Sequence, residues 1–354
     1  MEPSSLVREN VRRLDRPSYR TVPKGVIRMN DNSNLFMPNP VAARVSNMFD
    51  FDSLSMYPSI LADDLRAAIG KKFGIGASQV IVGNGSDEAI DLAVKTFIGP
   101  KDRVAVPVPT FEMYSMYAKI AGAKIVECPL EEGTFQLDVD ALLSADAKMI
   151  FLSSPNNPTG NSMRAEDMKR IIRESGAVVV ADEAYSDFTD AGSLIGMSKR
   201  AKNLLVLRTL SKAYALPGLR VGFCMGSREV VDSMCAACAP FRLNRFSEKV
   251  AIEAIADDSF VRKIAEMART ERKWVSSKLS KLGAKVYPSE TNFLLFRPPV
   301  PVKRFVEELL GKGIAIRDCS KQRMLANCAR VTFGRREINE KFIAACSDVL
   351  EGSA

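Results

Sequence analysis

Short apolar runs recur through the middle of this 354-residue chain, and amphipathic segments separate them. The runs are strand-sized and β-branched, which is typical of strands buried on both faces of a sheet. The intervening segments have helical spacing, as in Asp87 to Phe97, Met113 to Ala121 and Ala165 to Glu174. This alternation predicts an α/β fold with a mostly parallel central sheet covered on both faces. The expected strands are 80–82, 103–106, 124–127, 148–152, 177–181, 204–208 and 221–225.

The pattern changes at about Phe246. An amphipathic stretch from Phe260 to Leu282 predicts a long helix that ends at Gly283. Short strands and helices alternate beyond it, which indicates a smaller α+β lobe. The strands expected there are 291–296, 314–317 and 329–333, and the helices are 301–311 and 337–350. We therefore predict three parts: an N-terminal arm over 1–40, a large domain over 41–245 and a small C-terminal domain over 246–354.

The chain contains no histidine and seven cysteines. Without histidine, Ser-His, Cys-His and His-zinc chemistries are excluded, so proton transfer falls to Lys, Tyr, Asp or Glu. Cys235 and Cys238 have the spacing of a metal-binding pair, but no second pair accompanies them. We expect reduced cysteines in the core and no metal site.

The net charge is +8, yet Lys and Arg are dispersed and form no basic tail. We therefore expect a solvated basic surface and an anionic small substrate rather than nucleic acid. No apolar run approaches the ~20 residues of a membrane span, and the N-terminus has no signal-peptide core. These features predict a cytoplasmic protein that does not contact a membrane.

The segment T-L-S-K from Thr209 to Lys212 directly follows an expected strand, and Arg220 lies eight residues beyond the lysine. Two hydroxyls and a guanidinium suit a phosphate dianion, because Arg binds phosphate in a bidentate fork. The lysine amine can hold an aldehyde. A cofactor with both groups is pyridoxal 5'-phosphate (PLP), and the segment indicates a site for it.

Two further segments follow expected strands. Gly83 to Glu88 (G-N-G-S-D-E) opens a helix, whose amides and dipole favour an anion, although a plain turn explains the motif equally well. Ser153 to Gly160 (S-S-P-N-N-P-T-G) has the composition of a turn. Within it, Asn157 precedes a proline and is held extended. Its amide can then donate a hydrogen bond to the phenolic oxygen of a pyridine ring.

Asp182 ends the expected strand A-V-V-V-A, where a carboxylate can meet a pyridine nitrogen and keep it protonated. Capping of a following helix is the rival role. Tyr185 can hydrogen-bond the phenolic oxygen beside Asn157. Phe111 follows another strand end and can stack on the cofactor ring, although an ordinary buried aromatic is an equal alternative.

In this order, the segments resemble those of fold-type I PLP enzymes, and of the aminotransferase class I and II family in particular. The similarity runs from about Tyr57 to Gly334 and implies an aspartate-aminotransferase-like fold. Within the family, the chain is most similar to the histidinol-phosphate aminotransferases. The segments that carry this are G-N-G-S-D-E at 83–88, D-E-A-Y-S-D-F at 182–188, R-T-L-S-K-A-Y-A-L-P-G-L-R-V-G-F at 208–223 and R-D-C-S with R-V-T-F-G between 317 and 334.

The resemblance implies a role for each matching residue. Lys212 would form the Schiff base, Asp182 would pair with the pyridine nitrogen, Tyr185 and Asn157 would bind the phenolate, and Phe111 would stack on the ring. The residues that would hold the phosphate are Gly85, Ser86, Asp87, Thr209, Ser211 and Arg220.

The resemblance also implies substrate contacts and a partner. Arg330 would bind a substrate α-carboxylate, Arg317 the side chain or phosphate of the substrate, and Tyr19 would close over the pocket. Tyr57 would reach the phosphate in the other subunit, which implies a homodimer. Two features depart from the family pattern near the substrate entrance: the arm reads N-D-N-S-N-L-F at 30–36, and Ser59 stands where an acidic residue is usual.

The expected reaction is transamination from histidinol phosphate to 2-oxoglutarate, which yields imidazole-acetol phosphate and glutamate in histidine biosynthesis. Three alternatives stay open from the residues. An aminotransferase for aromatic or other amino acids would share every cofactor residue. A PLP-dependent decarboxylase of a phosphorylated amino acid would differ in the reaction. A PLP-binding regulator would need a DNA-binding module, for which we expect no room.

Overall fold

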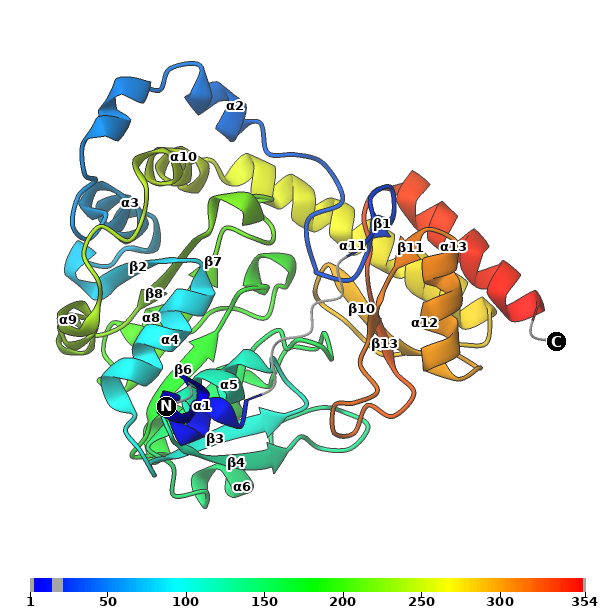
Figure 1. The fold of residues 1–354 in the computed structure, drawn as a ribbon, viewed down its shortest axis with the longest axis horizontal. Helices are drawn as coiled ribbons and strands as arrows, with labels where there is room; N and C mark the ends of the chain where they lie inside the picture. Colours follow the sequence, from blue (N-terminus) through cyan, green and yellow to red (C-terminus); the bar gives the residue numbers. More distant parts are fainter. Residues whose placement is uncertain (1–2, 15–21, 353–354) are drawn as a thin grey trace.

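Seven strands between Val80 and Met225 form one sheet in the computed structural model, which describes residues 3–14 and 22–352 (Figure 1). Its strand order is β2-β8-β7-β6-β5-β3-β4. The strands are β2 (Val80–Asn84), β3 (Arg103–Val108), β4 (Lys124–Pro129), β5 (Met149–Ser153), β6 (Val178–Asp182), β7 (Leu204–Thr209) and β8 (Val221–Met225).

The sheet is mostly parallel, as the sequence predicts. The neighbours β4, β3, β5, β6 and β7 all pair in parallel, whereas β8 runs antiparallel to both β7 and β2. The carboxyl ends of β5, β6 and β7 therefore lie side by side. Those ends carry Ser153, Asp182 and Thr209.

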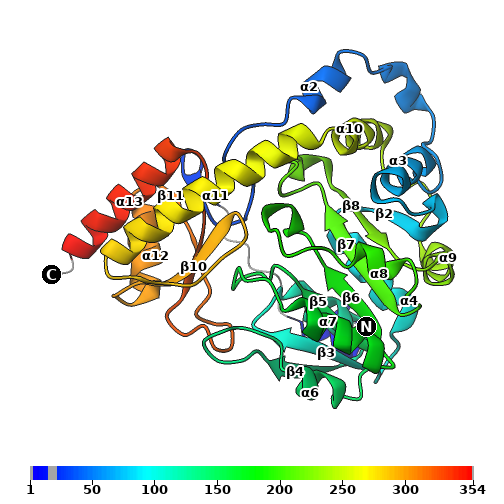
Figure 2. The ribbon, with the colours of Figure 1, turned by 180° about the vertical axis from the view of Figure 1, so that it is seen from behind.

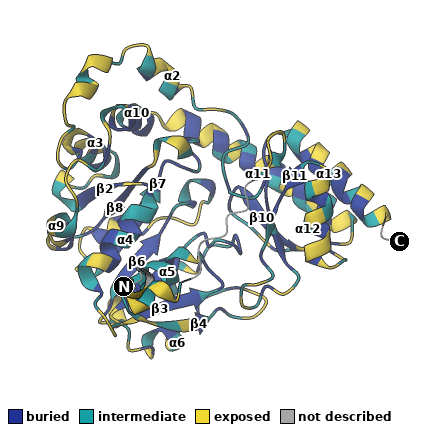
Figure 3. Cartoon of the chain, in the orientation of Figure 1, coloured by how far each residue is buried: buried dark blue, intermediate teal, exposed yellow. Residues whose placement is uncertain are grey.

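Helices cover both faces of this sheet (Figures 1 and 2). On one face, α4 (Ser86–Phe97), α5 (Met113–Ile120) and α9 (Arg228–Ala237) share a core with alternate strand residues. Figure 3 shows their buried sides turned toward the sheet and their exposed sides outward. The opposite face belongs to the second core, which includes residues of α2 (Val41–Ser46), α3 (Asp63–Phe73), α6 (Val139–Leu143), α7 (Ala165–Glu174), α8 (Ile195–Ser198) and α10 (Arg245–Ala256).

A smaller antiparallel sheet follows, in the order β12-β13-β10-β9. The long helix α11 (Asp258–Lys281) runs from the large body to this lobe (Figure 2). Phe296 of β10 (Phe293–Arg297) packs edge-on against Phe305 of α12 (Val302–Gly311) and Phe342 of α13 (Arg336–Glu351). The other strands of this sheet are β9 (Lys285–Val286), β12 (Arg317–Asp318) and β13 (Ala329–Thr332).

The N-terminal segment joins the small lobe. Strand β1 (Ile27–Arg28) pairs in parallel with β11 (Ile314–Ala315), and Met29 behind it is fully buried. The single strand expected over 314–317 is thus wrong, because the run divides at Ile316. Ile314 and Ala315 pair with the arm, whereas Arg317 and Asp318 pair with β13.

The first helix, α1 (Glu9–Arg12), packs on α5. All seven cysteines are free thiols, and five of them are buried. Across residues 3–14 and 22–352, the helices lack the combination of length and apolarity that crossing a bilayer requires.

Gly222 lets β8 pass directly beneath the turn that starts α4. A Cβ there would lie 2.2 Å from the Ser86 nitrogen and 2.4 Å from the Gly85 carbonyl carbon. Both contacts are to backbone, so the strand or the turn would have to shift. We expect Gly222→Ala to lower the free energy of unfolding by about 1–3 kcal/mol, measured by urea denaturation.

Gly311→Ala is the matched control. Gly311 ends α12, and a Cβ there would meet nothing within 4 Å. Alanine is the better helix former, so this variant should be as stable as the parent protein or slightly more stable. Equal stability of the Gly222→Ala variant and the parent would contradict the close approach.

Candidate active site

The strand ends of the large sheet open into a cavity of about 540 Å³ between the sheet and the small lobe. Arg317 and Arg330 of the small lobe form part of its wall. The cavity brings together nearly all the residues that the sequence predicts for the site. Those in its lining are Ser86, Asp87, Phe111, Asn157, Asp182, Tyr185, Thr209, Ser211, Lys212, Arg220, Arg317 and Arg330.

Lys212 lines this cavity, three residues beyond the end of β7. Its Nζ donates a hydrogen bond of 3.3 Å to the backbone oxygen of Asn32 and lies 5.6 Å from the ring centre of Tyr185. The side-chain amide of Asn32 donates to the Tyr185 hydroxyl at 2.8 Å. Asn32 of the arm therefore contacts both Lys212, the predicted Schiff-base lysine, and Tyr185, a predicted donor to the phenolic oxygen of the cofactor.

Asp182 is buried at the end of β6. Its Oδ2 accepts a hydrogen bond of 2.7 Å from the Tyr114 hydroxyl, and its Oδ1 accepts one of 2.9 Å from the backbone nitrogen of Ala184. Burial raises the pKa of Asp182, while the Tyr114 hydrogen bond opposes that rise. A nearby cation would favour the carboxylate, and a protonated pyridine nitrogen is such a cation.

The rival role for Asp182, helix capping, falls to a different residue. The next helix is the short 3₁₀ helix η4 (Ser186–Phe188), and its N-cap residue is Tyr185. Asp182 therefore does not cap this helix, and it lines the cavity instead.

Tyr114 also supports Phe111, the residue predicted to stack on the cofactor ring. Burial raises the pKa of Tyr114 well above its ordinary value, so its hydroxyl stays protonated and donates to Asp182. Its ring stacks on Phe151 with centroids 4.7 Å apart, and Phe111 meets it edge-on at 5.5 Å. Phe111 therefore lines the cavity from a fixed aromatic cluster.

Several donors for a phosphate line the cavity. The helix α4 begins at Ser86, after Gly85 with φ of 87°. The Arg220 guanidinium rests on that turn, where a Cβ on Gly85 would lie 2.4 Å from its nitrogen, and it pairs with Asp87 at 3.1 Å. The Thr209 and Ser211 hydroxyls are 3.0 Å apart. A helix N-terminus, a guanidinium and paired hydroxyls fit a phosphate dianion.

Two arginines of the small lobe are neighbours in the cavity wall. Arg317 and Arg330 are directly paired across β12 and β13. Like charges in that position repel each other, so an anion between them would relieve a cost. Arg330 donates to Asn157 Oδ1 and, at 2.7 Å, to the Asn30 oxygen. Its buried Nε has no hydrogen-bond partner among the described residues, which leaves a donor for a carboxylate.

The contact with Arg330 also orients Asn157. Because the amide oxygen of Asn157 accepts from Arg330, its NH₂ group is left to donate. This is the orientation that the predicted hydrogen bond to a phenolic oxygen requires.

Gly85 is not part of the lining but precedes Ser86 in the turn that starts α4, whereas Tyr57 lies away from the cavity. Tyr57 is 77% exposed, outside the cavity of its own chain, and stacks on Phe241 with ring centroids 4.8 Å apart. Tyr19 lies outside the described residues.

Sequence reasoning missed Asn32 and Tyr114. The backbone of Asn32 has φ of 57°. Its backbone nitrogen donates to the Thr332 hydroxyl at 3.0 Å, and that hydroxyl donates to the side-chain oxygen of Asn32 at 3.1 Å. The only sequence signal was the unusual run of Asn residues in the arm. Tyr114 ends the segment P-T-F-E-M-Y that follows β3, but its contact with Asp182 spans 68 residues and has no local signal.

Comparisons with known proteins agree with this geometry. Residues 24–345 match the model of the family "Aminotransferase class I and II". The chain is 34% identical over 352 residues to a histidinol-phosphate aminotransferase from Thermoanaerobacter sp. (strain X514), covering 98% of this chain and 99% of the relative.

Solved structures share the fold. The histidinol-phosphate aminotransferase of Sinorhizobium meliloti, in complex with PLP, gives a TM-score of 0.86 at 22% identity, covering 92% of this chain and 91% of that one. A mutant aspartate aminotransferase of Thermus thermophilus gives 0.79 at 22% identity, covering 97% and 99%. These confirm the aspartate-aminotransferase-like fold predicted from the sequence. With the family match, they show that this chain belongs to the aminotransferase class I and II family and is a PLP-dependent aminotransferase.

Proposed function

We propose that this enzyme transfers the amino group of histidinol phosphate to 2-oxoglutarate, which yields imidazole-acetol phosphate and glutamate. The observation that carries the proposal is the single cavity that holds the Lys212 amine and the Asp182 carboxylate below the Arg317–Arg330 pair. Both substrates are anions, which suits that pair. The identity of 34% to an enzyme named for histidinol phosphate supports the choice of amino donor.

Bound PLP supplies an aldehyde for the amine and a ring that withdraws electrons from the carbon beside the nitrogen. Lys212 would hold the aldehyde, and its amine, once free, would be the base placed to move a proton at the substrate Cα. The Asp182 carboxylate would keep the pyridine nitrogen protonated. Tyr185 and Asn157 would donate to the phenolic oxygen, and the donors around Ser86 and Arg220 would bind the phosphate.

We also propose that the enzyme is a cytoplasmic homodimer in which Tyr57 reaches the partner's cofactor. An exposed apolar patch supports the dimer, because large apolar side chains gathered on a surface are typical of interfaces. The patch consists of Met48, Phe51, Leu54, Met56, Tyr57, Ile60 and Phe241.

The first test is the visible absorption of the PLP-loaded protein as histidinol phosphate is added without a keto acid. We expect the visible band of the lysine-bound cofactor to disappear and 2-oxoglutarate to restore it. Lys212→Ala is the control, and it should show no turnover. A band that responds only to another amino acid would indicate a different amino donor, and release of carbon dioxide would indicate a decarboxylase. Failure to bind PLP would refute the proposal.

Variants of Arg330 and Arg317 should affect the two substrates differently. Losing a hydrogen bond to a charged group costs about 1.5–3 kcal/mol, or roughly 10- to 100-fold in binding. We expect Arg330→Met to raise the KM for 2-oxoglutarate by that factor and to change the KM for histidinol phosphate much less. Arg317→Met should raise the KM for both substrates, because Arg317 would bind the phosphate of one and the side-chain carboxylate of the other. Steady-state kinetics with each substrate varied will measure both variants, and an equal rise for both substrates in the Arg330→Met variant would contradict these roles.

Leu54 tests the dimer. It lies in the apolar patch and is 52% exposed, so Leu54→Asp should yield monomers of 38.9 kDa in sedimentation experiments. Tyr57→Phe removes only a hydroxyl, so that variant should remain dimeric and bind PLP about tenfold more weakly. A monomeric parent protein, or unchanged PLP affinity in the Tyr57→Phe variant, would contradict the arrangement.

A further inference from the structure

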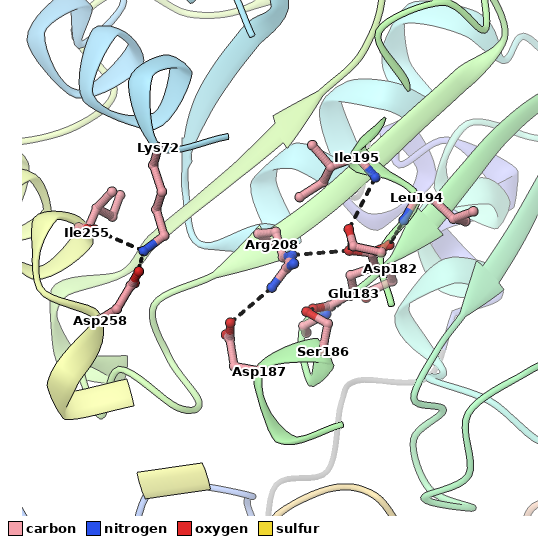
Figure 4. Close-up of polar contacts among 12 residues, drawn as sticks. Lys72, Asp182, Glu183, Ser186, Asp187, Leu194, Ile195, Arg208, Ile255 and Asp258 are labelled. Atoms are coloured by element: carbon pink, nitrogen blue, oxygen red, sulfur yellow. Dashed lines mark hydrogen bonds and ion pairs between the residues drawn. The ribbon is translucent and has the colours of Figure 1, made fainter. Parts of the chain in front are cut away.

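An ion cluster lies behind the candidate active site, formed by the buried Glu183 and the partly buried Arg208 and Asp187 (Figure 4). Glu183 follows Asp182 at the end of β6, and Arg208 precedes Thr209 at the end of β7. Asp182 pairs with Leu207 in the sheet, and the Glu183 nitrogen donates to the Leu207 oxygen at 3.0 Å. Glu183 and Arg208 are therefore neighbours on adjacent strands.

These two charges face away from the cofactor side. Side chains alternate between the two faces of a sheet, so Glu183 and Arg208 point to the face opposite Asp182 and Thr209. The two cores of the large body show the same alternation along β6, because Val180 belongs to one core and Ala181 to the other. The ion cluster therefore does not touch the cofactor itself.

Arg208 bridges two carboxylates from two segments. Its Nε lies 3.2 Å from Glu183 Oε2, and its NH1 lies 3.1 Å from Asp187 Oδ1. Its guanidinium also lies 5.6 Å from the ring centre of Phe73 in α3. Asp187 belongs to η4, the turn that follows Tyr185. Arg208 thus links the end of β7 both to the end of β6 and to the turn that carries Tyr185.

Further hydrogen bonds hold Glu183 in place. The Ser193 hydroxyl and the Leu194 nitrogen each donate to the Glu183 carboxylate at 2.6 Å. The Ser186 hydroxyl donates to the Glu183 backbone oxygen at 2.8 Å. The covering helix α3 is itself anchored, since Lys72 donates to the Ile255 oxygen at 3.0 Å and pairs with Asp258 (Figure 4).

A buried ion pair contributes little net stability, but removing one partner is costly because it leaves an uncompensated charge. What such a cluster supplies is a fixed geometry. Arginine suits the task because its planar fork can bind two carboxylates at once, whereas the amine of lysine is a single point charge on a flexible chain.

We propose that Arg208 is a positioning residue, which holds Asp182, Tyr185 and Thr209 in the arrangement that the cofactor needs. The proposal rests on the proposed function, since it concerns the PLP site. Arg208 pairs with Glu183, which follows Asp182, and so fixes the Asp182 carboxylate. Arg208 also pairs with Asp187 and so fixes the turn that carries Tyr185. Thr209 directly follows Arg208 in the chain.

The test is a pH titration of the visible band of the bound cofactor in an Arg208→Met variant. A pyridinium charge and a donor to the phenolic oxygen both disfavour a further proton on the lysine-linked nitrogen. The Arg208→Met substitution should loosen Asp182 and Tyr185 and therefore raise the pH midpoint of the visible band, by about half a pH unit or more. The dissociation constant of PLP, measured by equilibrium dialysis, should rise about tenfold.

Arg336→Met is the matched control. Arg336 also pairs with a carboxylate, that of Glu271, at 2.8 Å, but this pair joins α13 to α11 in the small lobe. This variant should lose stability in urea and keep the parent's titration midpoint and PLP affinity. Arg208→Lys retains the charge and can hold one carboxylate at a time, so its midpoint should lie between those of the parent and the Arg208→Met variant.

Asp187→Asn provides a second route if Arg208→Met does not fold. It removes only the charge beside the Tyr185 turn, and its midpoint should also rise. A folded Arg208→Met or Asp187→Asn variant with the parent's midpoint and PLP affinity would overturn the positioning role. Failure of the parent to bind PLP would instead overturn the proposed function, so the two failures are distinguishable.

Discussion

The parallel pairing of β5, β6 and β7 is the constraint on which the site depends. Parallel strands end at the same edge of a sheet, so groups that follow each strand meet there although the chain separates them by dozens of residues. Asp182 and Lys212 reach one cavity for this reason. The antiparallel β8 adds to it, because Gly222 allows the turn before α4 to approach closely enough for Arg220 to rest on that turn.

Charge is concentrated in this cavity at a cost that the expected ligands relieve. Asp182 is buried, and burial raises its pKa; a protonated ring nitrogen would hold it ionised. Arg317 and Arg330 face each other across a strand pair, where an anionic substrate would separate their charges. Behind the site, Arg208 stands between two carboxylates and needs no ligand. On the cofactor side, Asp182 and the two facing arginines would thus gain a partner from the ligands, whereas Arg208 already pairs with two carboxylates of the protein.

The sequence predicted most of the large sheet because each strand and helix there carries its own local pattern. The prediction failed where the extent of a strand depends on which distant segment it pairs with. The run 314–317 looks continuous, yet Ile314 pairs with the arm and Arg317 with β13. Asn32 was missed for a related reason, since its contacts with Thr332 span 300 residues. The predicted roles of the site residues rest on the family resemblance, and the structure adds that most of them share one cavity.

By itself, the sequence determined the α/β class and the absence of histidine chemistry, and its short motifs predicted which residues would hold PLP, because periodicity and short motifs are local properties of the chain. Tertiary structure alone decided how those residues are held. The arm that contacts Lys212 and Tyr185, the hydroxyl of Tyr114 on Asp182 and the ion cluster around Arg208 all join segments distant in sequence. Such contacts leave no periodic signal, since they depend on which elements the packed core places side by side.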